Sequence, residues 1–413
     1  MKKLLLPILV LSAASLSAQQ ITRCASYEHM QDQIAADPSI TAIIDAQEAK
    51  VARFEQEHPN GYQTRAVITI PVVFHVVYAN ATENISTLRL QEQLAVLNED
   101  YRKVNSDVSN VPSAWTSLAA DCEVQFCMAA RDPNGVATTG IERISSSVSS
   151  WSTNDNVKHA SSGGADAWNA DAYLNIWICD LGGGLLGYAQ FPGLNPATDG
   201  VVLDFAYTGK TGAISPYNLG RTATHEVGHW LGLKHIWGDD GTSCTGSDLV
   251  SDTPSQGPEN YGCPAIPTTD NCQTASPGVM SMNYMDYTDD ACMYFFTTGQ
   301  KTRMWGFING SRPMLATSNG CVPVGITEQP LSSVFTLYPN PTDGQVTLDF
   351  GSAAQTAYDI AVFNTLGEKV QAAHFEMRNE QTMMLDLRNQ SAGLYLIEIR
   401  SKNEKITRRI VVQ

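Results

Sequence analysis

The sequence predicts an α+β domain followed by a small all-β sandwich. Residues 66–78 (AVITIPVVFHVVY) are β-branched and apolar, which indicates a buried strand. Residues 87–104 carry apolar side chains at helical spacing and indicate the first long helix. From Val334 onward, stretches of alternating apolar residues are separated by turn residues, which is typical of a sandwich of short strands.

Further elements of the first domain follow from the same patterns. Strands are predicted over 124–130, 173–179, 185–191 and 200–205. The stretch 185–191 follows three glycines and is expected at the edge of the sheet, near the cleft. Helices are predicted over 220–232 and 298–316, the second capped by Thr297 or Thr298. Residues 145–164 and 236–290 are rich in loop-forming residues.

Composition limits the class of protein. The chain has 413 residues and a formal net charge of −16, which argues against nucleic acid as a partner. Residues 1–18 have a basic start, a short apolar run and small residues, and they indicate a secretory signal peptide. No other stretch is long enough to span a membrane. Nine cysteines in an exported chain predict disulfides and leave at least one cysteine outside a pair.

The predicted organisation has five parts. The signal peptide is followed by a polar, helix-prone segment at 19–65, which we interpret as a pro-segment, with an ordinary N-terminal extension as the alternative. The α+β domain covers 66–321, a linker covers 322–333, and the sandwich covers 334–413. The sandwich shows no catalytic constellation of residues.

One motif carries most of the chemistry. Residues 225–235 read H-E-x-x-H-x-x-G-x-x-H. His225 and His229 are four residues apart, so on a helix they lie on one face and can bind one zinc ion. His235 can join them only if the helix ends and the chain turns back, and Gly232 is placed to allow that turn. Glu226 would lie beside the metal, where it can accept a proton from a bound water.

The alternative is an amphipathic helix that happens to be rich in histidine. Five specified residues at this spacing should arise by chance on the order of once in ten thousand sequences of this length, so the metal site is the better interpretation. The extended motif resembles those of the metzincin metallopeptidases.

Longer segments narrow that resemblance. HEVGHWLGLKHIWGDD, DLVSDTPSQ and MNYMDYTDDACM resemble segments of the pappalysin family of metzincins, and the likeness extends over residues 66–321. It implies a zinc endopeptidase with a twisted mixed sheet, a long zinc helix and an irregular lower subdomain. It also implies that Met285 forms an apolar floor beneath the histidines and that Tyr287 stabilises the oxyanion of the tetrahedral intermediate. A simple packing role is the alternative for Tyr287.

The resemblance also implies stabilising sites in the loop-rich stretch. Two bridges are implied, Cys244–Cys272 and Cys263–Cys292, while the pairing of the remaining residues Cys122, Cys127, Cys179 and Cys321 is not decided by the sequence. Structural calcium is implied as a second cofactor, and its candidate ligands are Asp248, Asp252 and Thr253, with Asp239 and Asp240 as further candidates. The alternative is that these acids are merely solvated.

Latency is implied for the segment before the first strand. Arg23-Cys24 matches an element by which pro-segments of the resembling peptidases place a thiolate on the zinc. We therefore expect Cys24 to be unpaired, which leaves eight cysteines for four bridges. Because a member of the family prefers arginine after the scissile bond, we expect maturation at Thr64–Arg65 and an arginine pocket with Asp289 or Asp290 as its acid. In the alternative, Cys24 is bridged and Arg65 is incidental.

The C-terminal stretch resembles another family. LYPNPTDG, VFNTLGEKV and GLYLIEI are similar to the sorting domain of type IX secretion cargo. This resemblance implies that residues 334–413 engage the secretion machinery, and that the protein passes through the periplasm and across the outer membrane to the cell surface or the medium.

The expected function is that of a secreted endopeptidase on protein or peptide substrates. Substrate is expected to lie extended and to pair with the edge strand around 186–190. Two other classes remain open, a non-catalytic surface adhesin on this scaffold and a zinc amidase or toxin of narrow substrate range. Glu226 argues against the adhesin, because a structural metal site does not need a general base.

Overall fold

The computed structural model describes residues 21–63, 66–323, 335–350, 359–370, 373–378, 381–400 and 405–413. The predicted signal peptide, the Thr64–Arg65 junction and most of the predicted linker lie outside these residues. The chain divides into two compact units, Met1–Val324 and Gly325–Gln413. Among the described residues, no helix is both long enough and apolar enough to cross a membrane.

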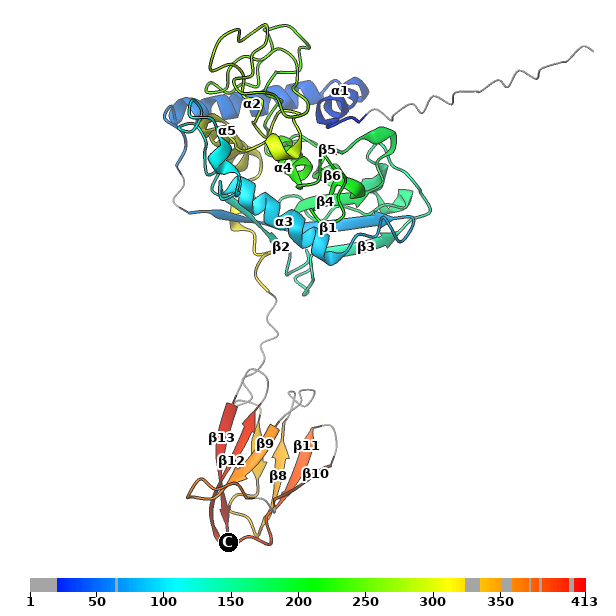
Figure 1. Ribbon diagram of the computed structural model, residues 1–413. Coiled ribbons are helices and arrows are strands. Elements are labelled where there is room, and N and C mark those ends of the chain that lie inside the picture. The colour runs from blue at the N-terminus through cyan, green and yellow to red at the C-terminus, as the bar shows by residue number, and fades with distance from the viewer. Residues whose placement is uncertain are drawn as a thin grey trace, which may run out of the picture. The chain divides into compact units, whose positions relative to one another are not determined.

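The first unit is built on a mixed sheet (Figure 1). Its central strand β1 pairs in parallel with β4 on one edge and with β2 and β3 along the other edge. Strand β6 pairs in parallel with β4, and β5 adds to β6 in the antiparallel direction, which makes β5 the outer strand. The strands are β1 (Ile68–Tyr78), β2 (Val124–Met128), β3 (Ile141–Ser145), β4 (Leu174–Cys179), β5 (Gly187–Ala189) and β6 (Val201–Asp204).

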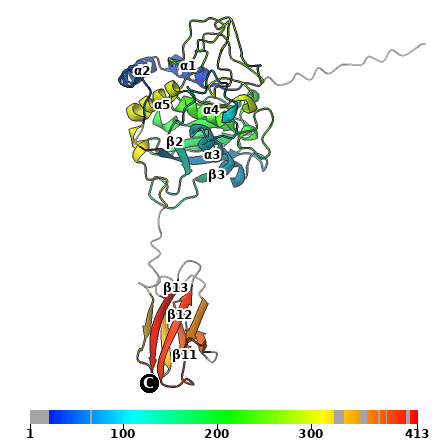
Figure 2. The ribbon, with the colours of Figure 1, turned by 60° about the vertical axis from the view of Figure 1, so that its left-hand side comes forward.

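The helices of this unit lie around the sheet. Two belong to the segment before β1, and α3 and α4 pack against the sheet (Figure 2). The closing helix α5 begins with a capping box at Thr297 and ends before Pro313, which cannot continue a helix. The helices are α1 (Ser26–Ala36), α2 (Ile40–Glu57), α3 (Thr87–Tyr101), α4 (Arg221–Trp230) and α5 (Thr298–Ser311).

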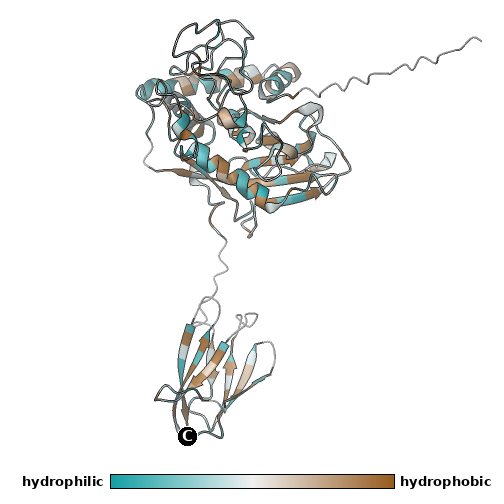
Figure 3. Ribbon diagram, viewed as in Figure 1, coloured by the Kyte–Doolittle hydropathy of each residue, from teal (hydrophilic) through white to brown (hydrophobic). Residues whose placement is uncertain are grey.

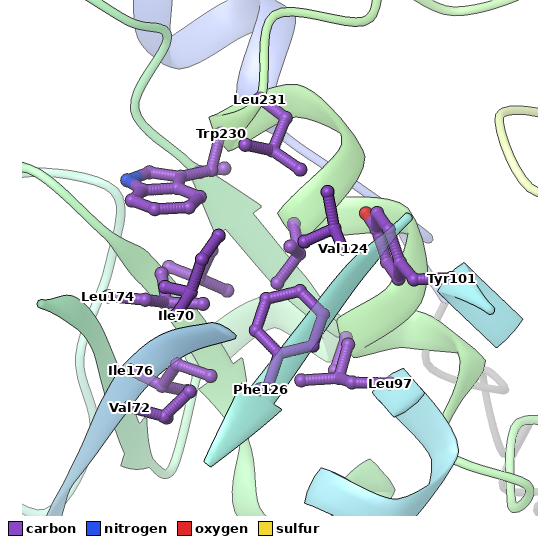
Figure 4. Close-up of a cluster of buried hydrophobic side chains, with 14 of the residues drawn as sticks. Ile70, Val72, Leu97, Tyr101, Val124, Phe126, Leu174, Ile176, Trp230 and Leu231 are labelled. Carbon is purple, nitrogen blue, oxygen red and sulfur yellow. The ribbon is translucent and has the colours of Figure 1, made fainter. Parts of the chain in front are cut away.

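A single apolar cluster joins the sheet to its helices (Figure 4). Side chains of β1, β2 and β4 contact α3 through Leu97 and Tyr101, and they contact the end of α4 through Trp230 and Leu231. The strands of this core are nearly continuous apolar runs, as expected for parallel strands buried on both faces (Figure 3). This packing holds α4 rigidly across the sheet.

The second unit contains two antiparallel sheets that share one core. The sheets have the orders β10-β11-β8-β7 and β13-β12-β9. Alternate residues such as Val346 and Leu348 in one sheet and Ile397 and Ile399 in the other fill the core, which makes this unit a β-sandwich. Its strands are β7 (Thr336–Tyr338), β8 (Gln345–Asp349), β9 (Asp359–Phe363), β10 (His374–Met377), β11 (Thr382–Asp386), β12 (Gly393–Arg400) and β13 (Lys405–Val412).

The predicted fold class is confirmed, with differences in detail. Strand β3 was not predicted from the sequence, because it is half exposed and lacks a clear alternation of apolar residues. The predicted strand at 185–191 is shorter, because only Gly187–Ala189 pairs with β6. The predicted helix at 298–316 ends at Ser311, and residues 313–317 form a 3-10 turn.

Candidate active site

Helix α4 carries the histidine motif, and all ten of its residues are buried. It begins after Gly220, whose φ of +83° favours glycine. The Asp290 carboxylate accepts hydrogen bonds from the backbone N–H groups of Leu219 (2.8 Å) and Arg221 (3.2 Å). A negative charge therefore lies at the N-terminus of the helix, where the free N–H groups and the helix dipole favour it.

The turn after α4 depends on Gly232. Its φ is +91°, and a Cβ atom there would lie 2.0 Å from the ring of Phe307. Only glycine fits this conformation and this close approach. The chain reverses at this point, so the Nε2 atom of His235 lies 3.1 Å from the Nε2 atom of His229, which is itself 3.0 Å from the Nε2 atom of His225.

Each of the three rings is oriented through its Nδ1 atom. That atom faces an oxygen acceptor at 2.6–2.8 Å: the carbonyl oxygen of Tyr284 for His225, that of Leu233 for His229, and the carboxylate of Asp239 for His235. Nδ1 therefore donates in each ring, and burial holds the pKa of His225 and His229 well below the usual value. A neutral ring with Nδ1–H presents a lone pair at Nε2.

Three lone pairs thus converge on one point inside the protein. Lone pairs held this close repel one another, and a bound cation would remove that repulsion. Imidazole nitrogens in a buried cluster suit zinc. Within the described part of the chain, one group of potential ligands has its atoms within 4.8 Å of one another, and its members are Cys24, His225, His229 and His235.

The fourth member of this group comes from the segment before β1. The Cys24 thiol is buried and lies 3.4 Å from Oε2 of Glu226. Two residues further on, the Ser26 hydroxyl donates to the same oxygen at 2.7 Å and accepts from the backbone N–H of Ala189 in β5 at 2.7 Å. Ser26 was not predicted as a site residue, and the one signal for it in the sequence was its closeness to Cys24.

Glu226 has the environment of a proton acceptor. Burial raises its pKa to about 7, although hydrogen bonds from Ser26 and Cys24 act in the opposite direction. Among the side-chain atoms that the structure describes, Oε1 of Glu226 is buried without a hydrogen-bond partner. Gly187 leaves room for this side chain, because a Cβ atom there would lie 3.0 Å from Cγ of Glu226.

The turn at 283–287 passes beneath the histidines. Met285 is buried, and a Cβ atom on Gly228 would lie 2.5 Å from its sulfur, so the methionine packs directly under α4. The Tyr287 hydroxyl lies 3.0 Å from Nε2 of His235 and 3.4 Å from the carbonyl oxygen of Cys24. Burial, with Cys24 and Glu226 nearby, raises the pKa of Tyr287 well above its usual value, so its hydroxyl stays a donor.

The N-terminal segment pairs with the edge strand. Thr22 donates to the carbonyl of Gly184 and accepts from the N–H of Leu186, both at 3.0 Å, and Ala25 donates to the carbonyl of Gly187 at 3.2 Å. Thr22 and Leu185 form a parallel bridge. The segment thus uses the edge on which the sequence analysis expected substrate to pair.

Arg23 binds the acid at the start of α4. Its guanidinium lies 2.9 Å from Oδ1 of Asp290 and 2.9 Å from the Thr222 hydroxyl, and it stacks over the Tyr217 ring at 4.4 Å. Both charged side chains are fully buried. Of the two acids that the sequence analysis considered for an arginine pocket, Asp290 is the one in contact with an arginine, and Asp289 has no such contact among the described ion pairs.

The three main calcium candidates do not all lie together: Asp248 and Thr253 contact each other, whereas Asp252 contacts the start of α5. The Thr253 hydroxyl lies 2.9–3.0 Å from both carboxylate oxygens of Asp248 and 2.9 Å from the carbonyl oxygen of Val250. Burial raises the pKa of Asp248 to about 7, although hydrogen bonds from Thr253 and from the backbone of Val250 act in the opposite direction. Asp252 instead accepts from Thr297 and Gly299 at the start of α5.

The two further candidates, Asp239 and Asp240, accept hydrogen bonds from other side chains. Asp239 is the acceptor for His235, and Asp240 accepts from the hydroxyls of Ser243 and Thr245 at the surface.

The cysteines form three bridges. Cys244–Cys272 and Cys263–Cys292 are those that the resemblance implied, and Cys127–Cys321 joins β2 to the end of the first unit. The expectation of four bridges was wrong, because Cys122 and Cys179 are buried thiols in the core, as Cys24 is at the histidines. Sequence alone could not separate core thiols from bridged cysteines.

Comparisons with known proteins agree with this geometry. Residues 158–309 match the family described as pregnancy-associated plasma protein-A, and residues 336–413 match the secretion system C-terminal sorting domain. An extracellular metalloprotease of Arthroderma benhamiae is 34% identical over 247 residues, which are 58% of this chain and 77% of the relative.

Two solved structures from Tannerella forsythia are similar. A promirolysin mutant is 46% identical with a TM-score of 0.68, over 73% of this chain and 99% of that one. Mature mirolysin in complex with a cleaved peptide is 51% identical with a TM-score of 0.62, over 63% and 100% of the two chains.

The fold, the histidine cluster and these relatives define a secreted metalloendopeptidase of the metzincin type, and this class implies a catalytic zinc. The chain belongs to the pregnancy-associated plasma protein-A, or pappalysin, family. Its second unit is a type IX sorting domain, which directs export to the cell surface or the medium.

Proposed function

We propose that the chain is made as a latent zinc endopeptidase that cleaves internal peptide bonds before arginine. The observation that carries the proposal is the buried group of four ligand atoms within 4.8 Å, three from the catalytic unit and one from the segment before β1. His225, His229 and His235 would hold the zinc, which when bound would polarise the scissile carbonyl and acidify a water molecule. The match to a promirolysin over a larger share of the chain supports a proform.

Glu226 is the general base of this proposal. A carboxylate with a pKa of about 7 can accept a proton from the attacking water and return it to the leaving amine near neutral pH. Its free Oε1 atom is available for that proton. The Tyr287 hydroxyl, which remains protonated, would donate to the developing oxyanion.

Latency in this proposal uses residues 22–26. Cys24 would supply the fourth ligand in place of water, Ser26 engages the Glu226 carboxylate, and Thr22 and Ala25 pair with residues 184–187 at the start of the edge strand. Substrate would pair with β5 only after this segment leaves. Maturation at Thr64–Arg65, which lies outside the described residues, would release the segment that ends at Thr64 from a catalytic unit that begins at Arg65.

The arginine preference rests on Asp290. Its contact with Arg23 supports a pocket that takes a guanidinium beside the metal centre, and the buried, hydrogen-bonded carboxylate suits that ligand. A substrate arginine just after the scissile bond would replace Arg23. Because Arg65 stands just after the Thr64–Arg65 bond, the same preference would direct self-cleavage to that bond.

Structural calcium is the second proposed cofactor. Asp248, Thr253 and the carbonyl of Val250 bring oxygen atoms together, which is the donor type that calcium prefers. The pKa of about 7 for the buried Asp248 carboxyl supports a cation there. Asp252 would serve as a helix cap rather than as a ligand. We also propose that residues 334–413 engage the type IX machinery and are removed after export.

Digestion of casein or gelatin by residues 66–323 tests the function. The parent should hydrolyse these substrates, and Glu226→Ala should retain zinc and fold but lose nearly all activity. Binding without hydrolysis by both proteins would favour the adhesin, and activity restricted to small amides would favour the amidase. Substantial proteolysis by zinc-replete Glu226→Ala would remove Glu226 from the mechanism.

A further inference from the structure

A second ionic contact holds the N-terminal segment on the catalytic unit, away from the four ligand atoms. Both carboxylate oxygens of Glu48 in α2 lie close to one guanidinium nitrogen of Arg303 in α5, at 2.6 and 2.8 Å. The ammonium of Lys234 lies 3.5 Å from Oε1 of the same carboxylate. Helices α2 and α5 lie side by side in both views (Figures 1 and 2).

The cationic side of this contact belongs entirely to the catalytic unit. Arg303 is 1% exposed, and its Nε–H donates to the carbonyl of Gly232 at 3.0 Å. Its guanidinium also lies over the Phe307 ring at 5.2 Å. The arginine is therefore fixed by the turn after α4 and by α5, whether or not Glu48 is present. A fixed guanidinium presents a ready binding site for a carboxylate.

Release of α2 would remove the carboxylate that binds Arg303 directly, while the more distant charge of Asp248 would remain in the catalytic unit. Among the ion pairs of the described residues, Glu48 is the carboxylate partner of both Arg303 and Lys234. Glu55, whose charge also interacts with Arg303, leaves with the same helix. Arg303 would keep its hydrogen bond to Gly232 and its place over Phe307, so the opened site would present an oriented guanidinium to another carboxylate.

An apolar hollow adjoins Lys234 and Glu48. A cavity of about 100 Å³ lies between α1 and α2 on one side and the catalytic unit on the other, and the catalytic side is lined by Phe191, Pro192, Lys234 and Phe307. The Phe191 ring lies 5.3 Å from the ring of His229. The hollow therefore lies beside Lys234, and one of its lining rings lies near His229, on the face that the N-terminal segment covers.

The path of the N-terminal segment indicates on which side of the scissile bond Arg303 and Lys234 lie. Arg23, before Cys24, reaches Asp290, whereas the chain after Cys24 passes Gln190 through Gln33 before it reaches Arg303. Asp290 is the proposed pocket for the residue after the scissile bond. Arg303 and Lys234 therefore lie on the opposite side, which would receive residues before that bond.

We propose that Arg303 and Lys234 form a carboxylate-binding subsite of the mature enzyme, which selects substrates with an acidic side chain upstream of the scissile bond. The inference rests on the proposed function, because it requires the segment 19–65 to leave. Glu48 then occupies in the proform the place of a substrate glutamate or aspartate.

The test uses mature residues 66–323 and paired fluorogenic peptides with arginine after the scissile bond. Each pair carries Glu or Gln at one of the six positions upstream. We expect one position at which Glu raises kcat/KM about tenfold over Gln, the factor that a charge-assisted hydrogen bond of about 1.4 kcal/mol supplies. The dissociation constants of the same peptides for the Glu226→Ala form, measured by fluorescence anisotropy, should show the same ratio.

Variants of Lys234 and Arg303 test whether these residues cause the preference for Glu over Gln. Lys234→Ala, at a half-exposed site, and Arg303→Lys, which keeps the charge but loses the fixed fork, should each reduce the Glu-to-Gln ratio. Arg102→Ala removes a cation that lies just after α3 and pairs with Asp121, and it should leave the ratio unchanged. Equal treatment of Glu and Gln at all six positions, or a preference that survives both variants, overturns the inference. Failure to cleave any peptide, with the binding ratio intact, overturns the proposed function instead.

Discussion

Substitution of Arg23 by alanine should weaken latency strongly. The Arg23–Asp290 pair has a 2.9 Å contact between two fully buried side chains, and Arg23 also binds Thr222 and Tyr217. Removal of one partner from such a pair costs about 3 kcal/mol, which raises the population with an open cleft by about two orders of magnitude. Asp290 keeps its bonds from Leu219 and Arg221, so α4 should remain in place.

The assay follows conversion of the purified proform by gel electrophoresis and by hydrolysis of an arginine-containing peptide. Arg23→Ala should convert with a much shorter lag than the parent, and Arg23→Lys should lie between them. Arg53→Ala is the matched control, because it removes an exposed arginine from the same segment. If Arg23→Ala converts as slowly as Arg53→Ala, the pair does not hold the segment closed, and the magnitude derived from its burial is wrong.

Three further predictions follow. A calcium-selective chelator should lower the melting temperature of residues 66–323 by several degrees and expose 236–290 to self-cleavage, with Asp248→Asn insensitive to chelator; an unchanged melting temperature in the parent would mean that the acids are only solvated. Deletion of 334–413 should leave the purified catalytic unit active but retain it in the periplasm, and normal export of the truncated chain would contradict this. Cys24→Ser should mature faster than the parent and give a mature N-terminus at Arg65 or within a residue of it, so a Cys24→Ser proform that stays latent would end the thiolate proposal.

The elements that could be predicted from the sequence are those that depend on neighbouring residues in the chain. The buried strand β1, the long helix α3 and the turn at Gly232 follow from periodicity and from steric limits on backbone conformation. His225, His229 and His235 were recognisable because ligand spacing on a helix is fixed by its geometry. Strand β3 was not recognisable, since its residues are half exposed and β1 alone defines its place.

Contacts between segments that are far apart in the chain could not be predicted from the sequence. Cys127 and Cys321 are 194 residues apart, and nothing local distinguishes them from the buried thiols of Cys122 and Cys179. Asp239 was considered for calcium, yet the reversal of the chain after Gly232 places it on the Nδ1 atom of His235. The partnership of Glu48 with Arg303 likewise depends on how α2 packs on α5, which no spacing rule predicts.

Zinc K-edge absorption of the Glu226→Ala proform tests the central claim most directly. Under the proposed function this variant would not mature itself, so the segment before the first strand would stay in place. The account predicts three nitrogen ligands at about 2.1 Å and one sulfur at about 2.3 Å, with the sulfur lost in Cys24→Ser and in residues 66–323 alone. A proform that binds zinc without a sulfur ligand would contradict the account.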